Sequence, residues 1–212
     1  MIDESATEAP PRRPTRAEQR AATRESIVRA TADCLVAEGY AGVTTRRVAQ
    51  RAGIAQSTVM HHFETREALL VEAVEHLAVR LAANAFERID LAALRTPDHR
   101  AAVLDEAWVE FTSPESLAAA QVWAAVWAEP ELAPTLRELE TRVTVIIVEA
   151  ARALFPELAD DPRLPALIDS SVALIRGLAA AIPIWGGEAV TARWEAIKPL
   201  VVEAAAHLLD EG

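Results

Sequence analysis

The stretch "VTTRRVAQRAGIAQSTVMHHF", residues 43–63, constrains the fold of this chain more than any other. Thr44 is a good N-cap for a short helix, and Gly53 is the kind of residue that ends a helix in the left-handed conformation. A second short helix is expected from about Ala55 to His62. Two short helices joined by a tight turn that contains glycine form a helix-turn-helix, which the stretch therefore predicts.

Helices are also expected on both sides of this motif. Thr15 and Glu18 have the spacing of a capping box, and apolar residues recur after them at three- and four-residue steps, so a helix is expected that ends at Gly39. Thr65 is expected to cap the helix that follows the motif, with Glu67 favourably placed in its first turn.

The composition favours an all-α protein throughout. Hydrophobic residues make up 51% of the 212-residue chain and there are only seven glycines. The longest run rich in β-branched residues is "VTVIIV", residues 143–148, and it lies inside an otherwise helical pattern. We expect a disordered tail at 1–14, a helix-turn-helix domain at 15–64 and a helical domain at 65–212.

Charge is distributed unevenly along the chain. Residues 1–11 carry a net charge of −3, residues 12–66 carry ten Arg and five acids for +5, and residues 67–212 carry −13, within a total of −11. A basic block joined to an acidic body points to a polyanion partner for the basic block. The alternative is a solvated, arginine-rich helix face.

Three features of the sequence favour a cytoplasmic protein. The single cysteine, Cys34, excludes an internal disulfide, fits a reducing compartment and falls on an apolar helix face, where we expect a core residue. The N-terminus has no apolar signal region, and we see no apolar run of the ~18–20 residues that a membrane span needs.

The chain resembles the tetracycline-repressor (TetR) family of transcriptional regulators from about residue 16 to 75. The matching elements are "A…L…EGY…VTTRRVA", the "AGI" turn, the "HF" pair and "REALL", in the order and spacing of that family. The resemblance implies an N-terminal DNA-binding domain and a variable C-terminal domain that dimerises and holds a small-molecule pocket. Such proteins usually repress, and ligand binding releases them from a palindromic operator.

Four positions depart from the family pattern. Ala55 stands where a capping Ser is common, and Ser57 where Gly is frequent. Met60 replaces the usual Tyr that reaches a phosphate, and methionine cannot donate that hydrogen bond. Arg66 replaces the usual Lys, which keeps the charge and adds bidentate capability.

A recognition helix in the major groove presents its polar side chains to bases and its ends to phosphates. We expect base contacts from Gln56, Ser57, Thr58 and His61. We expect phosphate contacts from Thr44, Thr45, Arg46, His62, Thr65 and Arg66. For Thr44 and Thr65 the alternative is simple helix capping, and for His62 it is packing beside Phe63. Arg12, Arg13 and Arg16 form either a minor-groove arm or a solvated tail.

The acidic body offers aromatic residues and small-residue helices. An apolar ligand pocket is expected to include Trp108, Phe111, Trp123, Trp127 and Trp185, although large aromatics at helical spacing also suit a core. An apolar or aromatic effector follows, with a neutral or cationic part if acids line the pocket. The last two long helices, with "ALIDSSVALIRGLAAA" and "LVVEAAAHLL", are the expected homodimer surface or else part of the chain's own core.

Two other classes of protein compete with this interpretation. An enzyme or metal site would use Ser57, His61 and His62, but adjacent histidines on a helix point about 100° apart and no metal-ligand spacing surrounds them. We therefore expect no catalytic residue, metal or cofactor. A helical adaptor that uses the motif only for protein contacts is the second competitor.

Overall fold

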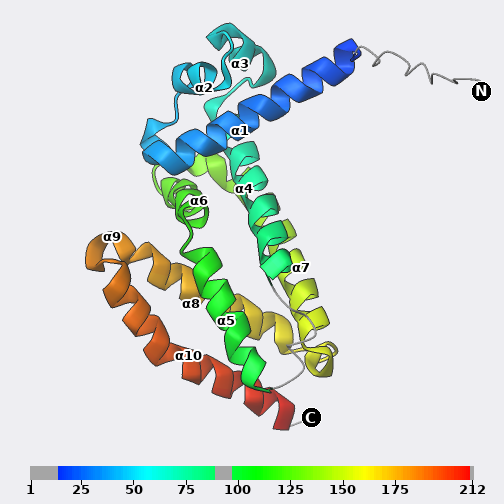
Figure 1. Ribbon diagram of the computed structural model, residues 1–212, viewed down its shortest axis with the longest axis vertical. Coiled ribbons are helices and arrows are strands. Elements are labelled where there is room, and N and C mark those ends of the chain that lie inside the picture. Colours follow the sequence, from blue (N-terminus) through cyan, green and yellow to red (C-terminus); the bar gives the residue numbers. More distant parts are fainter. Residues whose placement is uncertain (1–13, 89–96, 211–212) are drawn as a thin grey trace, which may run out of the picture.

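The computed structural model describes residues 14–88 and 97–210, and these residues form helices and no strand, which confirms the all-α fold. The expected disordered tail, residues 1–14, lies outside the described part of the chain except for Pro14. Three helices come first: α1 (Arg16–Gly42), α2 (Thr45–Ala52) and α3 (Gln56–His62). They gather at one end of the molecule, where α2 and α3 lie beside α1 (Figure 1).

The first helix begins where the capping box predicts. The Thr15 amide donates to Glu18 Oε2 at 2.5 Å, and the Glu18 amide donates to Thr15 Oγ1 at 3.2 Å. The regular helix is interrupted at Gly39, as predicted, because Gly39 adopts φ +71°; a further helical turn follows the kink and ends at Gly42. The end of α1 lies against α6 (Pro114–Ala125), where the Tyr40 amide donates to the Gln121 side chain.

A few buried apolar side chains pack the two short helices of the motif against the rest of the domain. Gly53 takes φ +69° at the end of α2, as its position predicts. Val48, Val59 and Phe63 are buried in a core shared with α1. Cys34 belongs to the same core, and burial raises the pKa of its thiol, so it is a packing residue as expected.

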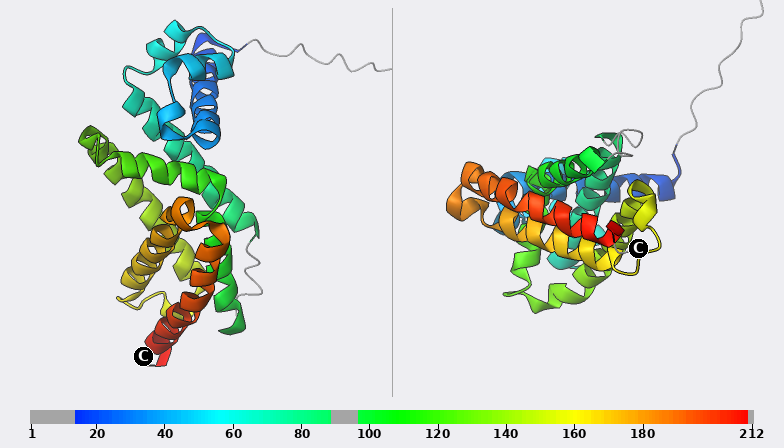
Figure 2. Two further views of the ribbon diagram at one scale, coloured as in Figure 1. Left: turned by 90° about the vertical axis from the view of Figure 1, so that its left-hand side faces the viewer. Right: turned by 90° about the horizontal axis from the view of Figure 1, so that it is seen from below.

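The body consists of longer helices connected by short turns. In chain order they are α4 (Arg66–Arg88), α5 (Pro97–Phe111), α6, η2 (Pro130–Leu132), α7 (Ala133–Leu154), η3 (Pro156–Leu158), α8 (Leu164–Ala180), α9 (Ile182–Trp185) and α10 (Gly187–Asp210). Figure 1 shows α4 running from the motif into the body, with α8 and α10 side by side at the other end. The three views together show an elongated molecule with the helix-turn-helix at one end (Figures 1 and 2).

Two hydrophobic cores hold these helices together. The larger one includes residues of α1 to α4, α6 and α7, among them Leu70 and Leu77 of α4. The smaller one is built on Trp108 of α5 and Trp194 of α10, whose rings stack with centroids 5.2 Å apart. Because α4 packs into the same core as α1, the predicted boundary at residue 64/65 falls inside a continuous core.

One apolar segment is longer than the sequence pattern suggests. Leu164–Trp185 is long and apolar enough to cross a membrane by length and composition alone, with a mean hydropathy of 1.6. It contains Asp169 and Arg176, so the expectation that no run reaches this length holds only for uninterrupted runs. Only 11% of its most apolar window is buried, and several residues of the segment line the cavity described below.

Candidate DNA-binding surface and effector cavity

Helix α3 presents polar side chains to solvent and apolar ones to the core. Gln56, Ser57 and His61 are exposed and Thr58 is half-buried, whereas Val59 is fully buried beneath them. The helix begins at Ala55 without a side-chain cap, as expected from the missing serine. The predicted base-reading residues therefore share the accessible side of one short helix.

Two contacts set the position of α3 relative to its neighbours. Gln56 Nε2 donates to Thr45 Oγ1 at 3.0 Å, which ties the start of α3 to the start of α2. Arg24 of α1 donates from Nη1 to the His62 carbonyl at 2.7 Å and lies over the Phe63 ring, 4.2 Å from its centroid. The side chain of Arg24 also pairs with Glu72, so α1 and α4 together fix the end of α3.

The expected phosphate-binding residues lie at helix starts. Thr44 Oγ1 accepts from the Arg47 amide at 3.3 Å, and Thr65 Oγ1 accepts from the Ala68 amide at 3.1 Å, so both cap their helices. Both side chains are also exposed, and Arg46 is exposed in the first turn of α2. Thr44 and Thr65 thus cap their helices, as the alternative interpretation expects. Both residues remain exposed to solvent.

Arg66 is engaged inside the protein, which differs from the expected phosphate contact. Its guanidinium donates to Val43 O at 3.1 Å and to the hydroxyl and carbonyl oxygens of Tyr40, each at 2.9 Å. Tyr40 in turn donates to Glu129 Oε2 at 2.5 Å, and Arg66 lies 3.5 Å from the same carboxylate. The sequence could not show this because Glu129 is far away in the chain, and a phosphate contact would have to break these bonds.

His62 is half-buried beside the motif core. Burial, followed by the positive charges of Arg20, His61 and Arg24, lowers the pKa of His62 below its usual range. The imidazole is therefore neutral near pH 7, and it meets the His61 ring edge-on with centroids 5.8 Å apart. His62 therefore packs against the motif core, as the alternative interpretation expects. A contact with phosphate would use an N–H group of the neutral ring as donor.

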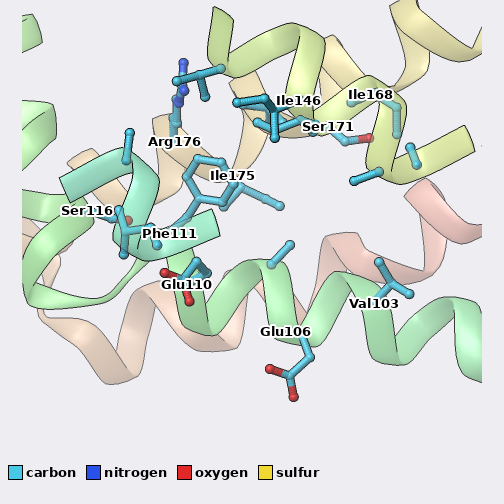
Figure 3. A pocket seen from close by; sticks show the side chains of 18 of the residues that line it. Val103, Glu106, Glu110, Phe111, Ser116, Ile146, Ile168, Ser171, Ile175 and Arg176 are labelled. Atoms are coloured by element: carbon cyan, nitrogen blue, oxygen red, sulfur yellow. The ribbon is translucent and has the colours of Figure 1, made fainter. Parts of the chain in front are cut away.

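A cavity of about 560 Å³ lies in the body, enclosed by α4, α5, α6, α7 and α8 with a contribution from α10. Its lining is mostly aliphatic, and Figure 3 shows Phe111 and Ile175 among the side chains around it. This volume falls in the range of small-molecule sites, ~300–1,000 Å³. A cavity of this size and lining can hold an apolar organic molecule.

The structure places two of the five expected aromatic residues at the cavity and the other three elsewhere. Phe111 and Trp123 line the cavity. Trp108 stacks on Trp194 in the smaller core, Trp127 is 95% exposed after α6, and Trp185 is 58% exposed in α9. Helical spacing placed Trp123 and Trp127 on one face, but α6 ends between them at Ala125, so they diverge.

Arg176 is the cavity residue that the sequence reasoning missed. It pairs with Glu140 at 2.5 Å, and its guanidinium carbon lies 4.6 Å from the centroid of the Trp123 ring. An arginine in the middle of an apolar helix was the available signal, because a charge there needs a partner. Among the described residues no group of three or more His, Cys, Asp or Glu could hold a metal ion.

Comparisons with known proteins agree with the geometry of the motif. Residues 27–73 match the family model described as bacterial regulatory proteins, tetR family. The chain is 33% identical over 154 residues to the HTH-type transcriptional regulator BetI of Burkholderia thailandensis, covering 69% of this chain and 77% of that protein.

Solved structures share the whole architecture. A transcriptional regulator from Rhodococcus sp. RHA1 superposes with a TM-score of 0.63 at 22% identity, over 89% of this chain and 96% of the other. A TetR-family regulator from Rhodococcus sp. gives a TM-score of 0.65 at 17% identity, over 89% and 99%. At these identities the likeness shows the fold alone.

Fold and motif define a helix-turn-helix transcriptional regulator with a helical body. The matched motif and the extent of the likeness to BetI show, more narrowly, that the chain belongs to the TetR family. Proteins of this family are generally DNA-binding repressors.

Proposed function

We propose that this protein is a ligand-responsive repressor that binds a palindromic operator as a homodimer and is released from it by a small apolar or aromatic effector. The observation that carries the DNA-binding part is the surface of α3, where Gln56, Ser57 and His61 are exposed above the buried Val59. A major groove about 12 Å wide admits one such helix. Thr58, at the half-buried edge of the same surface, completes the proposed set of base contacts.

Sequence specificity is assigned to Gln56 first. A glutamine can pair bidentately with adenine, and Thr45 already orients the Gln56 amide by a hydrogen bond. Selection of bound sequences from random DNA should return a palindrome. The unmodified protein should bind the half-sites of this palindrome in strong preference to other sequences. The Gln56→Ala variant should lose about 1–3 kcal/mol of discrimination at one base pair. Unchanged discrimination at every position would refute this assignment.

General affinity is assigned to Arg46, with Thr44, Thr45, Thr65 and His62 as further phosphate contacts. Arg46 is exposed beside the free amides at the start of α2, a favourable place for phosphate. Replacing Arg46 with Ala should weaken binding to all sequences alike and reduce the slope of log affinity against log salt by about 0.9. Arg137→Ala, an exposed arginine on α7, is the matched control. Arg66 is left out of this set because its guanidinium is bonded within the protein.

The dimer surface is assigned to α8 and α10. Exposed small residues recur along one side of α8 at Ser170, Ala173, Gly177 and Ala180, and a Cβ built on Gly177 meets no atom within 4 Å. The fold of one subunit therefore does not require glycine there, whereas close approach of a partner helix does. On α10 the side chain of Leu200 is 63% exposed.

A bulky charge at this surface tests the assignment. Gly177→Arg has room in the single subunit, so it should fold but elute as a monomer in size-exclusion chromatography with light scattering. It should also lose operator binding, because only a dimer reaches both half-sites. Ala153→Arg, on the exposed side of α7, should remain dimeric. A dimeric Gly177→Arg protein would show that the interface lies elsewhere.

A further inference from the structure

A cluster of basic side chains joins the end of α3 to the side of α1. Arg24 of α1 donates from Nη1 to the His62 carbonyl at 2.7 Å, and its guanidinium carbon lies 4.2 Å from the Phe63 ring centroid. Arg20 lies one helical turn before Arg24, on the same side of α1. Burial first and the charge of Arg20 second lower the pKa of His62, so Arg20 lies within electrostatic range of that ring.

The two arginines of this cluster differ in their availability to a ligand. Arg24 is engaged within the protein, because it also pairs with Glu72 of α4. Arg20 is exposed, and among residues 14–88 and 97–210 it forms no ion pair. His62 is half-buried, so part of it remains accessible beside Arg20. Arg20 is therefore free to bind an anion from outside, while Arg24 holds the end of α3 in place.

The charges that act on the His62 ring, within the described part of the chain, are positive. They come from Arg20 and Arg24 on α1 and from His61 on α3, whose ring meets that of His62 edge-on with centroids 5.8 Å apart. On α4, Glu72 faces Arg24 and pairs with it. Helix α2, the other neighbour of α3, supplies none of the described charges that shift the pKa of His62. The free protein thus has His62 neutral at about pH 7.

A phosphate group placed against this cluster would reverse the balance of charge at His62. Each DNA phosphate carries a negative charge, which attracts Arg20 and favours the imidazolium form of a nearby histidine. The neutral imidazole would take up a proton from solvent at its unprotonated ring nitrogen and could then donate a charge-assisted hydrogen bond to the phosphate. Binding of DNA and binding of the proton would therefore strengthen each other.

We propose that Arg20 and His62 form a phosphate site shared by α1 and α3, and that DNA binding at this site is coupled to the uptake of a proton. The inference rests on the proposed function, because it adds one residue, Arg20, and a dependence on pH to the same DNA-binding surface. The protein would accordingly hold DNA more firmly as the surrounding solution becomes more acidic.

The direction of the pH dependence follows from linkage between the two binding events. Contact with phosphate raises the pKa of His62 above its value in the free protein, which lies below the ordinary histidine value of about 6.5. Affinity for DNA is then constant above the higher pKa of the complex and rises as the pH falls below it. It levels off below the lower pKa of the free protein, and each unit between the two pKa values corresponds to about a tenfold gain in affinity.

Titration of a fluorescently labelled DNA duplex of mixed sequence with the full-length protein, at constant salt, measures this dependence by anisotropy. From about pH 8 to about pH 6 the affinity should rise by about three- to tenfold. His62→Gln should abolish the rise, whereas His207→Gln, at an exposed histidine in the last turn of α10, should keep it. The same rise in His62→Gln, or no rise in the unmodified protein, would overturn the proposal.

A pair of arginine variants tests the part played by α1. Arg20→Ala should weaken DNA binding and reduce the slope of log affinity against log salt by about 0.9 for each phosphate contact that is lost. Arg29→Ala is the matched control, because Arg29 is exposed nine residues further along α1 and therefore lies on the opposite side of the helix. Circular dichroism of each variant checks folding. Equal salt slopes in the two folded variants would contradict the assignment of Arg20.

Calorimetry distinguishes proton uptake from a general effect of charge. Titrations at about pH 6.5, in buffers of different ionisation enthalpy, should show net uptake of protons by the unmodified protein and less by His62→Gln. A protein that binds the duplex without taking up protons would refute this inference and leave the proposed function in place. A protein that binds neither the mixed-sequence duplex nor any DNA selected from random sequences would refute the proposed function, and this inference with it.

Discussion

The helix-turn-helix end and the helical body differ in the range of the contacts that define them. In α1 to α3 the contacts that cap and end the helices are mostly short in sequence: Thr15 with Glu18, Thr44 with Arg47, and the turn at Gly53. In the body they are long: Arg176 with Glu140, and Lys198 of α10 with Asp105 of α5 at 2.6 Å. The first region presents the exposed surface of α3, and the second contains a cavity.

This difference has a consequence for stability. The motif end has its interior filled by Val48, Val59 and Phe63, each nearly or fully buried. The body combines a stacked pair, Trp108 and Trp194, with a cavity of about 560 Å³. Because a cavity lacks dispersion contacts on its inner side, the body depends more heavily on its few large buried side chains.

The largest expected effect is at the smaller core of the body. Trp194 is fully buried and stacked on Trp108, so Trp194→Ala should lower the free energy of unfolding by about 3–5 kcal/mol. Trp127→Ala, at a side chain that is 95% exposed, should change it little. Chemical denaturation followed by far-ultraviolet circular dichroism measures both. Similar losses in the two variants would show that the body does not depend on the stacked pair.

The next effect is at the junction between the two regions. Arg66→Met removes the hydrogen bonds to Val43 and Tyr40 and the contact with Glu129, at a side chain only 28% exposed. We expect a loss of about 2–3 kcal/mol in the free energy of unfolding. Arg46→Met should leave stability nearly unchanged. An Arg66→Met protein of normal stability but reduced operator affinity would restore Arg66 as a phosphate contact.

A smaller gain is expected inside the motif. Ala55 has the extended backbone of an N-cap, φ −71° and ψ 144°, but provides no side-chain hydrogen bond. Ala55→Ser should therefore raise the free energy of unfolding by about 1 kcal/mol. Ala153→Ser, in the middle of α7, should give no gain because serine is not favoured within a helix. Equal effects at both positions in thermal unfolding would rule out a capping defect at α3.

The smallest effect is a pH dependence at His62. Its pKa is lowered in the folded state, so the unfolded chain binds a proton more readily. The contribution of His62 to the free energy of unfolding is constant above the usual histidine pKa of about 6.5. It is lost as the pH falls through the pKa of His62 in the folded protein. His62→Gln should flatten the decline of the unfolding midpoint on acidification below about pH 6.5. A decline of the same slope in both proteins would contradict burial of a neutral His62.

Local sequence patterns predicted the helix-turn-helix, its glycine turn and the start of α1, because caps and turns depend on residues three or four apart. The same reasoning predicted the interruption of the first helix at Gly39, where φ is +71°. It could not predict that the next amide, that of Tyr40, donates to the Gln121 side chain of α6, because those two residues are 81 positions apart in the chain.

What the sequence by itself determined is the all-α class, the two-helix motif and the polar composition of α3, all of which follow from periodicity and local chemistry. The tertiary structure decided which aromatic residues line the cavity, that Arg66 is bonded to Tyr40 and that Arg176 meets Trp123 and Glu140. These facts depend on which helices pass one another, and that is settled by packing of whole faces rather than by neighbours in the chain.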